Sequence, residues 1–392
     1  MRHLFHRLLL ILCLVASSLA NAQSPEQGTP YLLLDKGLQY RITKAINSMY
    51  NFDFATAEHD FTVIMYQYPE HPLPDFLMGL AYWWRIEVNV ENTRYDNIFI
   101  QYLDRANEKA KKMLDKDPKN KEAAFFLAAG YGFQGRLYSE RKSWAKATFA
   151  GKNALNYMEL SRGEQELNPE LLFGDALFNY FSIWIPENYP LLKPVVALFP
   201  KGNKKLGLQQ LESVASNAFY TRVEAQYFLF RLYGSEEKRP LDALRIVTYL
   251  HEKFPNNPYF HRSLARYLYT TGKWTEAMRE SFVILDRIEK RQVGYEANSG
   301  RYAAFFLGEY FYRVGNLPEA KNYFSKTLSF GEESESQESG YYLYALISLG
   351  KIATKEKNKS QARDYFNAVK KYAKRKHPAH QEAREYIKKN KL

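Results

Sequence analysis

Side chains that could carry catalysis or bind a metal are scarce in this sequence of 392 residues. After the first twenty residues the histidines are His59, His71, His251, His261, His377 and His380. None of them belongs to a His-Glu-x-x-His zinc motif, and the pair His377 and His380, although helically spaced, lacks a further ligand. Neither a phosphate-binding glycine loop nor a Gly-x-Ser-x-Gly nucleophile motif is present. We therefore expect no enzyme activity, no cofactor and no bound metal.

The residues best suited to binding are two arginines. Arg262 and Arg266 lie one helical turn apart and so share one face of a helix, with Tyr259 and Tyr269 on either side. Arginine interleaved with tyrosine can hold a carboxylate while stacking on an apolar or planar group. These residue types favour a binding surface over a reaction centre.

A recurring spacing indicates which elements position these arginines. A small residue is followed four positions on by an aromatic or small residue, seven on by an apolar or small one, and often twelve on by proline. The pattern occurs as Ala57, Phe61, Ile64 and Pro69, as Ala106, Ala110, Met113 and Pro118, and as Ala243, Val247, Leu250 and Pro255, while Ala277, Ala320 and Ala362 carry it without the proline. Small residues recur where the two helices of a pair cross closely. The pattern resembles the tetratricopeptide repeat (TPR) over most of residues 35–376.

The resemblance implies an all-α fold, a TPR-like solenoid in which antiparallel helix pairs form a right-handed superhelix. In this family the first helices of successive pairs line a concave groove that takes peptide segments of other proteins. With Ala277, Ala320 and Ala362 as equivalent points, the groove positions are Tyr259, Arg262, Arg266, Tyr269, Tyr302, Phe305, Glu309, Tyr312, Tyr344 and Lys351. The alternative is that several of these tyrosines only fill the packing between repeats.

Helix pairs are predicted at about 32–68, 74–118, 121–161, 173–218, 221–255, 257–291, 296–330 and 337–376, with a closing helix at 378–389. Gly135 is expected to end one helix, and 331–339 is expected to form a loop. The fourth pair is irregular, because Pro186, Pro190, Pro194 and Pro200 interrupt an apolar segment, 184–203. This segment either packs back onto the solenoid or docks a partner or membrane through Trp184, Ile185, Tyr189, Leu192 and Phe199.

A fainter likeness surrounds that segment. Phe178, Asn179, Ser182, Pro186, Gly202, Gly207 and Leu208 are similar to a stretch of the eukaryotic tetratricopeptide family that includes the yeast inclusion-body clearance protein. No function follows from this short match.

The net positive charge and the targeting signal lie at the two ends of the chain. Residues 1–22 have the layout of a cleaved secretory signal peptide, and 23–31 read as a flexible lead-in. The single cysteine, Cys13, lies in that signal, so the mature chain has no disulfide and no thiol chemistry. From Lys351 onward 14 basic and four acidic residues give +10 of the chain's net charge of +12, and 377–392 reads as a basic capping helix or tail. No basic stripe follows the solenoid itself, so no nucleic-acid partner is expected.

Together these features predict an exported, non-enzymatic scaffold of the periplasm or cell envelope that binds peptide segments in its groove. One alternative is an envelope enzyme or carrier that uses residues 184–200 as a lid or pocket. Another is a protein docked on an anionic membrane surface by that segment and the basic tail.

Overall fold

The computed structural model describes residues 31–161, 169–197 and 199–392. It divides into two compact units, the first ending at Arg41 and the second covering Ile42–Leu392. The predicted signal peptide and nearly all of the predicted lead-in lie outside the described residues.

The first unit contributes a short 3-10 helix, η1 (Leu32–Leu34), and the beginning of α2 (Lys36–Tyr50). Leu33 and Leu38 are buried, and the Gln39 side chain donates a hydrogen bond to the Leu33 carbonyl at 2.7 Å. The last nine residues of α2, from Ile42, belong to the second unit.

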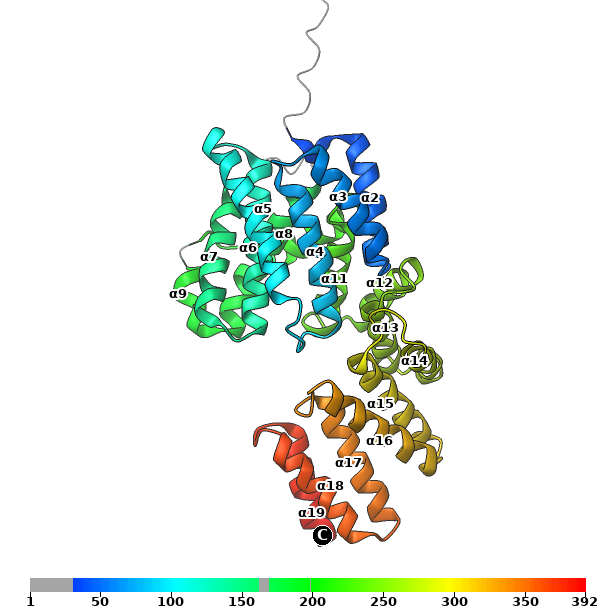
Figure 1. Cartoon of the computed structure of the whole chain (residues 1–392). Helices are drawn as coiled ribbons and strands as arrows, with labels where there is room; N and C mark the ends of the chain where they lie inside the picture. The colour runs from blue at the N-terminus through cyan, green and yellow to red at the C-terminus, as the bar shows by residue number, and fades with distance from the viewer. Residues whose placement is uncertain (1–30, 162–168, 198) are drawn as a thin grey trace, which may run out of the picture. The chain divides into compact units, whose positions relative to one another are not determined.

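The second unit is a succession of α-helices (Figure 1). After α2 these are α3 (Phe54–Gln67), α4 (Pro72–Val88), α5 (Asp96–Lys116), α6 (Lys121–Glu140), α7 (Trp144–Ser161), α8 (Pro169–Asn188), α10 (Lys204–Asn217), α11 (Arg222–Ser235), α12 (Pro240–Lys253), α13 (Pro258–Thr270), α14 (Trp274–Glu289), α15 (Ala297–Arg313), α16 (Leu317–Glu333), α17 (Gly340–Lys355), α18 (Lys359–Tyr372) and α19 (Pro378–Asn390). Helices pack as consecutive pairs from α4/α5 to α17/α18, and each second helix also packs on the first helix of the next pair. The predicted all-α, TPR-like solenoid of helix pairs is thus confirmed.

Local sequence signals set the starts of these helices. Asparagine or aspartate side chains accept a hydrogen bond from the first turn at Asp53, Asn120, Asn203, Asn257, Asn316 and Asn358. Proline occupies the first turn of α4, α12, α13, α16 and α19, where its missing amide hydrogen is not needed. The turn between α4 and α5 is enlarged and spans residues 89–95.

The alanines that mark the repeat are buried helix crossings. Ala57, Ala243, Ala277, Ala320 and Ala362 are all at most 1% exposed. Phe324 and Phe366 follow Ala320 and Ala362 by four residues, and their rings pack onto glycines of the preceding helix. A Cβ atom built on Gly308 would lie 2.6 Å from the Phe324 ring, and one built on Gly350 would lie 2.8 Å from the Phe366 ring. The two crossings are therefore equivalent, and the predicted register is correct.

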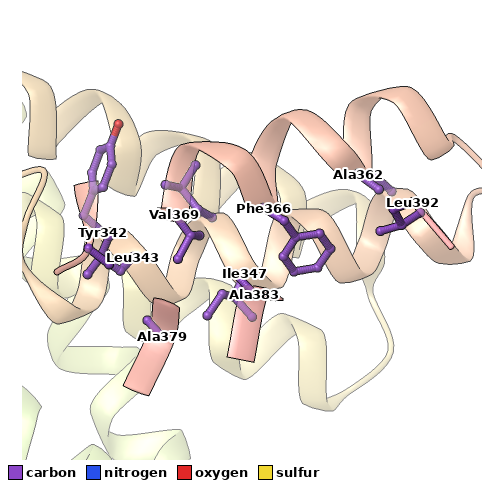
Figure 2. Packing of buried hydrophobic residues seen from close by; sticks show 12 residues of the cluster. Tyr342, Leu343, Ile347, Ala362, Phe366, Val369, Ala379, Ala383 and Leu392 are labelled. Carbon is purple, nitrogen blue, oxygen red and sulfur yellow. The ribbon is translucent and has the colours of Figure 1, made fainter. Parts of the chain in front are cut away.

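The last of these crossings also holds α19. Figure 2 shows Ala362, Phe366 and Val369 of α18 in one buried cluster with residues of α17 and with Ala379 and Ala383 of α19. The Phe366 and Tyr386 rings stack at 4.6 Å. The basic C-terminal residues thus include a packed helix whose apolar face covers the end of the solenoid.

Three predicted boundaries are wrong by a few residues. α6 continues past Gly135 to Glu140, because one glycine costs a helix only about 1 kcal/mol. α16 likewise runs through Gly331 to Glu333. α8 runs through Pro186 to Asn188, so the interruption begins later than predicted.

After α8 the chain folds back on that helix. η2 (Pro190–Leu192) and the four-residue α9 (Lys193–Val196) both pack against α8. Two glycines then allow α10 to approach α8 closely: a Cβ atom on Gly202 would lie 2.1 Å from Ser182 Oγ, and one on Gly207 would lie 2.8 Å from the Ala176 carbonyl oxygen. Residues of the faint family likeness therefore have a packing role.

No helix in the described ranges combines the length and apolarity that crossing a bilayer requires.

Candidate functional site

Two buried carboxylates lie on facing helices of the second unit. Glu224 of α11 accepts hydrogen bonds from the Tyr50 hydroxyl at 3.0 Å and from Trp84 Nε1 at 2.9 Å. Burial raises the pKa of Glu224 to about 6, although the hydrogen bonds from Trp84 and Tyr50 and the charge of Arg136 act in the opposite direction. This carboxyl group joins α2, α4 and α11.

Glu87, near the end of α4, is the second carboxylate. It accepts a hydrogen bond from the Tyr227 hydroxyl at 2.7 Å and one from Arg136 Nη2 at 3.0 Å, and Arg231 Nη1 lies 3.5 Å away. Arg136 also lies over the Trp83 ring, 4.4 Å from its centre. Two guanidinium groups thus face the Glu87 carboxylate, and the charge of Arg136 also acts on Glu224.

Arg262 of α13 is engaged with the C-terminus of α4. Its Nη2 atom donates to the Glu87 carbonyl at 2.9 Å, its Nη1 atom donates to the Val88 carbonyl, and the residue is only 6% exposed. Asn298 of α15 donates to the same Val88 carbonyl at 3.0 Å. The helix-end carbonyls carry partial negative charge, which a buried guanidinium neutralises. The expectation that Arg262 is free to hold a ligand is therefore wrong, because both of its Nη atoms are bound to the end of α4.

Arg266, one turn further along α13, differs from Arg262. It is exposed, and among the described residues it has no carboxylate partner. Burial of the side chain opposes its charge, but the surrounding tyrosine hydroxyls outweigh burial and raise its pKa. Those hydroxyls belong to Tyr341, Tyr302, Tyr267 and Tyr259. Arg266 is thus an exposed residue whose guanidinium has tyrosine side chains around it.

The rings beside Arg266 form a packed shelf. Tyr302 of α15 and Tyr341 of α17 meet at 4.8 Å with their planes 67° apart, and Tyr341 also contacts Phe305 at 4.8 Å. Arg231 of α11 extends the charge to the other side of α13, with 46% of its side chain exposed. We call Arg231, Tyr259, Arg266, Tyr302 and Tyr341 the arginine–tyrosine surface. Arg231 and Tyr341 are additions that the repeat alignment did not identify.

The remaining predicted groove residues have other partners. Tyr269 stacks on Phe306 at 4.7 Å and donates to Glu309, whose pKa burial raises. Tyr312 lies under Lys355, and Lys351 donates to Glu382 of α19 at 2.7 Å.

Phe305 and Tyr344 belong to the packing between repeats. Phe305 is 4% exposed, and Tyr344 packs against the buried clusters of the last helices. For these two aromatic residues the packing alternative holds.

The predicted docking segment is partly covered. Trp184 is half-buried, its Nε1 atom donates to Glu236 at 2.8 Å, and its ring contacts Phe181 and Tyr189. Ile185, Leu192 and Phe199 are also half-buried, whereas Tyr189 is exposed.

His377, one of the two helically spaced histidines, accepts a hydrogen bond from the Ala379 amide and so caps the start of α19.

Comparison with known proteins gives remote structural likeness only. No family model and no curated protein matches the sequence. Human IFIT1, solved as a dimer with m7Gppp-AAAA, is 14% identical over 86% of this chain and 69% of its own, with a TM-score of 0.44. The C-terminal part of a TPR repeat-containing protein from Cytophaga hutchinsonii is 10% identical over 74% of this chain and 99% of its own, with a TM-score of 0.42. The P58(IPK) TPR domain covers 90% of this chain at 9% identity and a TM-score of 0.25. Likeness this low says nothing about a shared ligand.

Proposed function

We propose that this protein is a non-enzymatic binding scaffold that holds carboxylate-bearing peptide segments of other proteins on the arginine–tyrosine surface. Helical-repeat folds commonly supply an extended binding surface, and the helix pairs described above build one. The proposal needs no cofactor and no nucleic-acid partner.

The observation that supports it is Arg266. Exposed arginines without a partner are common on convex surfaces, but this one lies among tyrosines of three successive first helices, α13, α15 and α17. A guanidinium group can bind a carboxylate through two parallel hydrogen bonds, while the rings accept the flanking side chains. Arg262 no longer contributes donors, and Arg231, the other arginine of the surface, already lies 3.5 Å from Glu87, so Arg266 carries the proposal.

The test uses a library of fluorescent peptides whose C-termini are either free or amidated. Wild-type protein is expected to bind a subset of peptides with free carboxylates. Arg266→Ala should weaken that binding at least tenfold, because both charge-assisted hydrogen bonds are lost. Arg266→Glu should abolish it, because repulsion adds to the lost contact. Arg279→Glu on α14 is the matched control, since Arg279 is an exposed arginine on a second helix. Equal binding by wild-type and Arg266→Glu protein would exclude this surface.

The proposed location is the periplasm or cell envelope, and it rests on the signal-peptide layout of residues 1–22. N-terminal sequencing of the protein recovered from an envelope fraction is expected to begin at Gln23 or within a few residues of it. Recovery of the chain from Met1 would contradict cleavage.

The lid alternative receives less support. A lid over a reaction centre would have to close on a polar pocket, whereas η2 and α9 pack on α8, the helix that precedes them. Membrane docking by the segment would require its apolar side chains to be exposed. Of the five predicted docking residues, only Tyr189 is exposed.

A further inference from the structure

Three potential metal ligands converge from three consecutive helices. They are His251 near the end of α12, His261 in the first turn of α13 and Glu280 in the middle of α14. One ligand atom from each lies within 4.8 Å of the other two. The His261 Nε2 and Glu280 Oε2 atoms are 2.9 Å apart, and His251 Nε2 lies 4.0 Å from the same oxygen. The two imidazole rings stack with centres 4.3 Å apart.

His261 already has the support that a metal-bound histidine needs. Its Nδ1 atom lies 2.9 Å from the Tyr295 hydroxyl, and that hydroxyl accepts a hydrogen bond from Arg287 Nη1 at 2.6 Å. With a metal on Nε2, the Nδ1 hydrogen would be donated to Tyr295. An oxygen partner of this kind fixes the ring's tautomer and orientation in metal sites.

His251 lacks any comparable partner. Among the described residues neither of its ring nitrogens makes a hydrogen bond, and Nδ1 is a buried atom. A buried polar group without a hydrogen bond costs free energy, so such a group needs an explanation. A metal bound through Nε2, the nitrogen nearer Glu280, would give the ring its first partner and draw it toward Glu280, while Nδ1 would stay without one.

The electrostatics are compatible with the neutral, metal-binding form of the rings. Burial lowers the pKa of both histidines, so both are uncharged at neutral pH, as metal ligation requires. Two charged groups face the cluster: Glu280, which favours a cation, and Arg287, which opposes one. The Nη1 atom of Arg287 already donates to the Tyr295 hydroxyl and to the Pro255 carbonyl oxygen.

We propose that His251, His261 and Glu280 bind one Zn²⁺ ion, which joins α12, α13 and α14. Two imidazoles and one carboxylate are a ligand set that suits zinc rather than magnesium or calcium, which prefer oxygen ligands. Three protein ligands leave a fourth position for water, on the side where Glu280 is 31% exposed. The site is separate from the arginine–tyrosine surface and does not depend on the proposed function.

The test measures zinc bound to the full mature chain, prepared without a polyhistidine tag. After equilibration with Zn²⁺ and dialysis, elemental analysis is expected to find one zinc per wild-type chain. Co²⁺ is expected to give the visible absorption of a four-coordinate site, and zinc should raise the Tm of the wild-type protein.

The variants His251→Gln and Glu280→Gln should each weaken zinc binding at least tenfold and remove the Tm shift. His59→Gln, which changes an exposed histidine of α3, should leave all three readouts unchanged.

The outcomes distinguish a specific zinc site from nonspecific zinc binding on the protein surface. Absence of zinc from the wild-type protein, or equal zinc in wild-type, His251→Gln and Glu280→Gln proteins, would overturn the proposal. If His251→Gln does not fold, Glu280→Gln decides the matter, because the partly exposed Glu280 tolerates a change to glutamine better. Peptide binding is measured separately, so failure here leaves the scaffold proposal unaffected.

Discussion

Buried carboxyl groups are the residues whose chemistry departs most from the ordinary. Glu224 accepts hydrogen bonds at one oxygen, from Tyr50 and Trp84, while its other oxygen, Oε2, is buried without a partner. A proton on Oε2 would remove the negative charge without disturbing either hydrogen bond. That arrangement explains physically why burial raises the pKa of this group to about 6.

The free energy of unfolding should therefore decrease as the pH rises from 4.5 to about 6. In this range folded Glu224 keeps a proton that the unfolded chain has lost. The elevated pKa corresponds to about 2 kcal/mol, present below pH 4.5 and lost as the pH rises through 6. Glu224→Gln mimics the protonated form and should lack this contribution. Urea unfolding of both proteins across the pH range measures it, and identical slopes of stability against pH would contradict it.

At the scale of single helices, the repeat is defined by crossings such as the one at Ala320. The side chain is fully buried, and Phe324, one turn later, rests on Gly308 of α15. Space at the crossing is thus set by two residues with almost no side chain. A larger side chain at either position must push α15 and α16 apart.

Replacement of Ala320 by Leu is expected to overpack this crossing and to destabilise the protein by about 1–3 kcal/mol. Ser325→Leu, an exposed position of the same helix α16, is the control and should change stability by less than about 0.5 kcal/mol. Chemical denaturation followed by circular dichroism compares them. Equal stabilities of the two variants would show that the crossing tolerates a larger residue.

Helix boundaries and crossings were the features most accessible from the sequence. They depend on local signals, such as the prolines that begin α12 and α13 and the small residues at Ala277 and Ala320, which act within one pair of helices. The partners of Arg262 were not accessible in the same way. Its hydrogen bonds go to residues 87 and 88, more than 170 positions earlier, and no local spacing encodes such a contact.

The buried polar clusters were not predicted, for the same reason. His251, His261 and Glu280 are ten and nineteen positions apart, on three helices, and no motif spacing joins them. A signal was present for Glu87, since a lone acid near the end of the apolar helix α4 must find a buried partner. Its partner Arg136 lies on another helix pair. The sequence therefore indicates that Glu87 needs a partner but does not identify which residue supplies it.

At the scale of the second unit, contacts between distant repeats set this protein apart from a simple solenoid. In most helical repeats each pair contacts only its neighbours. Here the end of α4 is bound by α13 and α15, and Asn257 donates to the Tyr50 carbonyl at 2.8 Å. These links tie early pairs to later ones, so the pairs between them should unfold together.

Arg262→Met should therefore affect both ends of its contact. Two carbonyls of α4 lose a buried charged donor, at a cost of about 2 kcal/mol. Hydrogen exchange should become faster both at the end of α4 and in α13, although α4 itself is unchanged. Arg279→Met, on the exposed face of α14, is the matched control. Faster exchange limited to α13 would mean that the contact does not hold α4.

The contacts of the Arg262 guanidinium also bear on how the protein would respond to mechanical force. A solenoid pulled at its end peels apart one pair at a time, each at a similar force. From α16 onward the described helices pack only on near neighbours in the chain, so tension at the C-terminus should first strip off α19, α18 and α17 in small steps. The part bounded by α4 and α15 should then resist until its cross-links fail at once. The protein would thus combine an extensible end with a stiff body, in a single chain without disulfides.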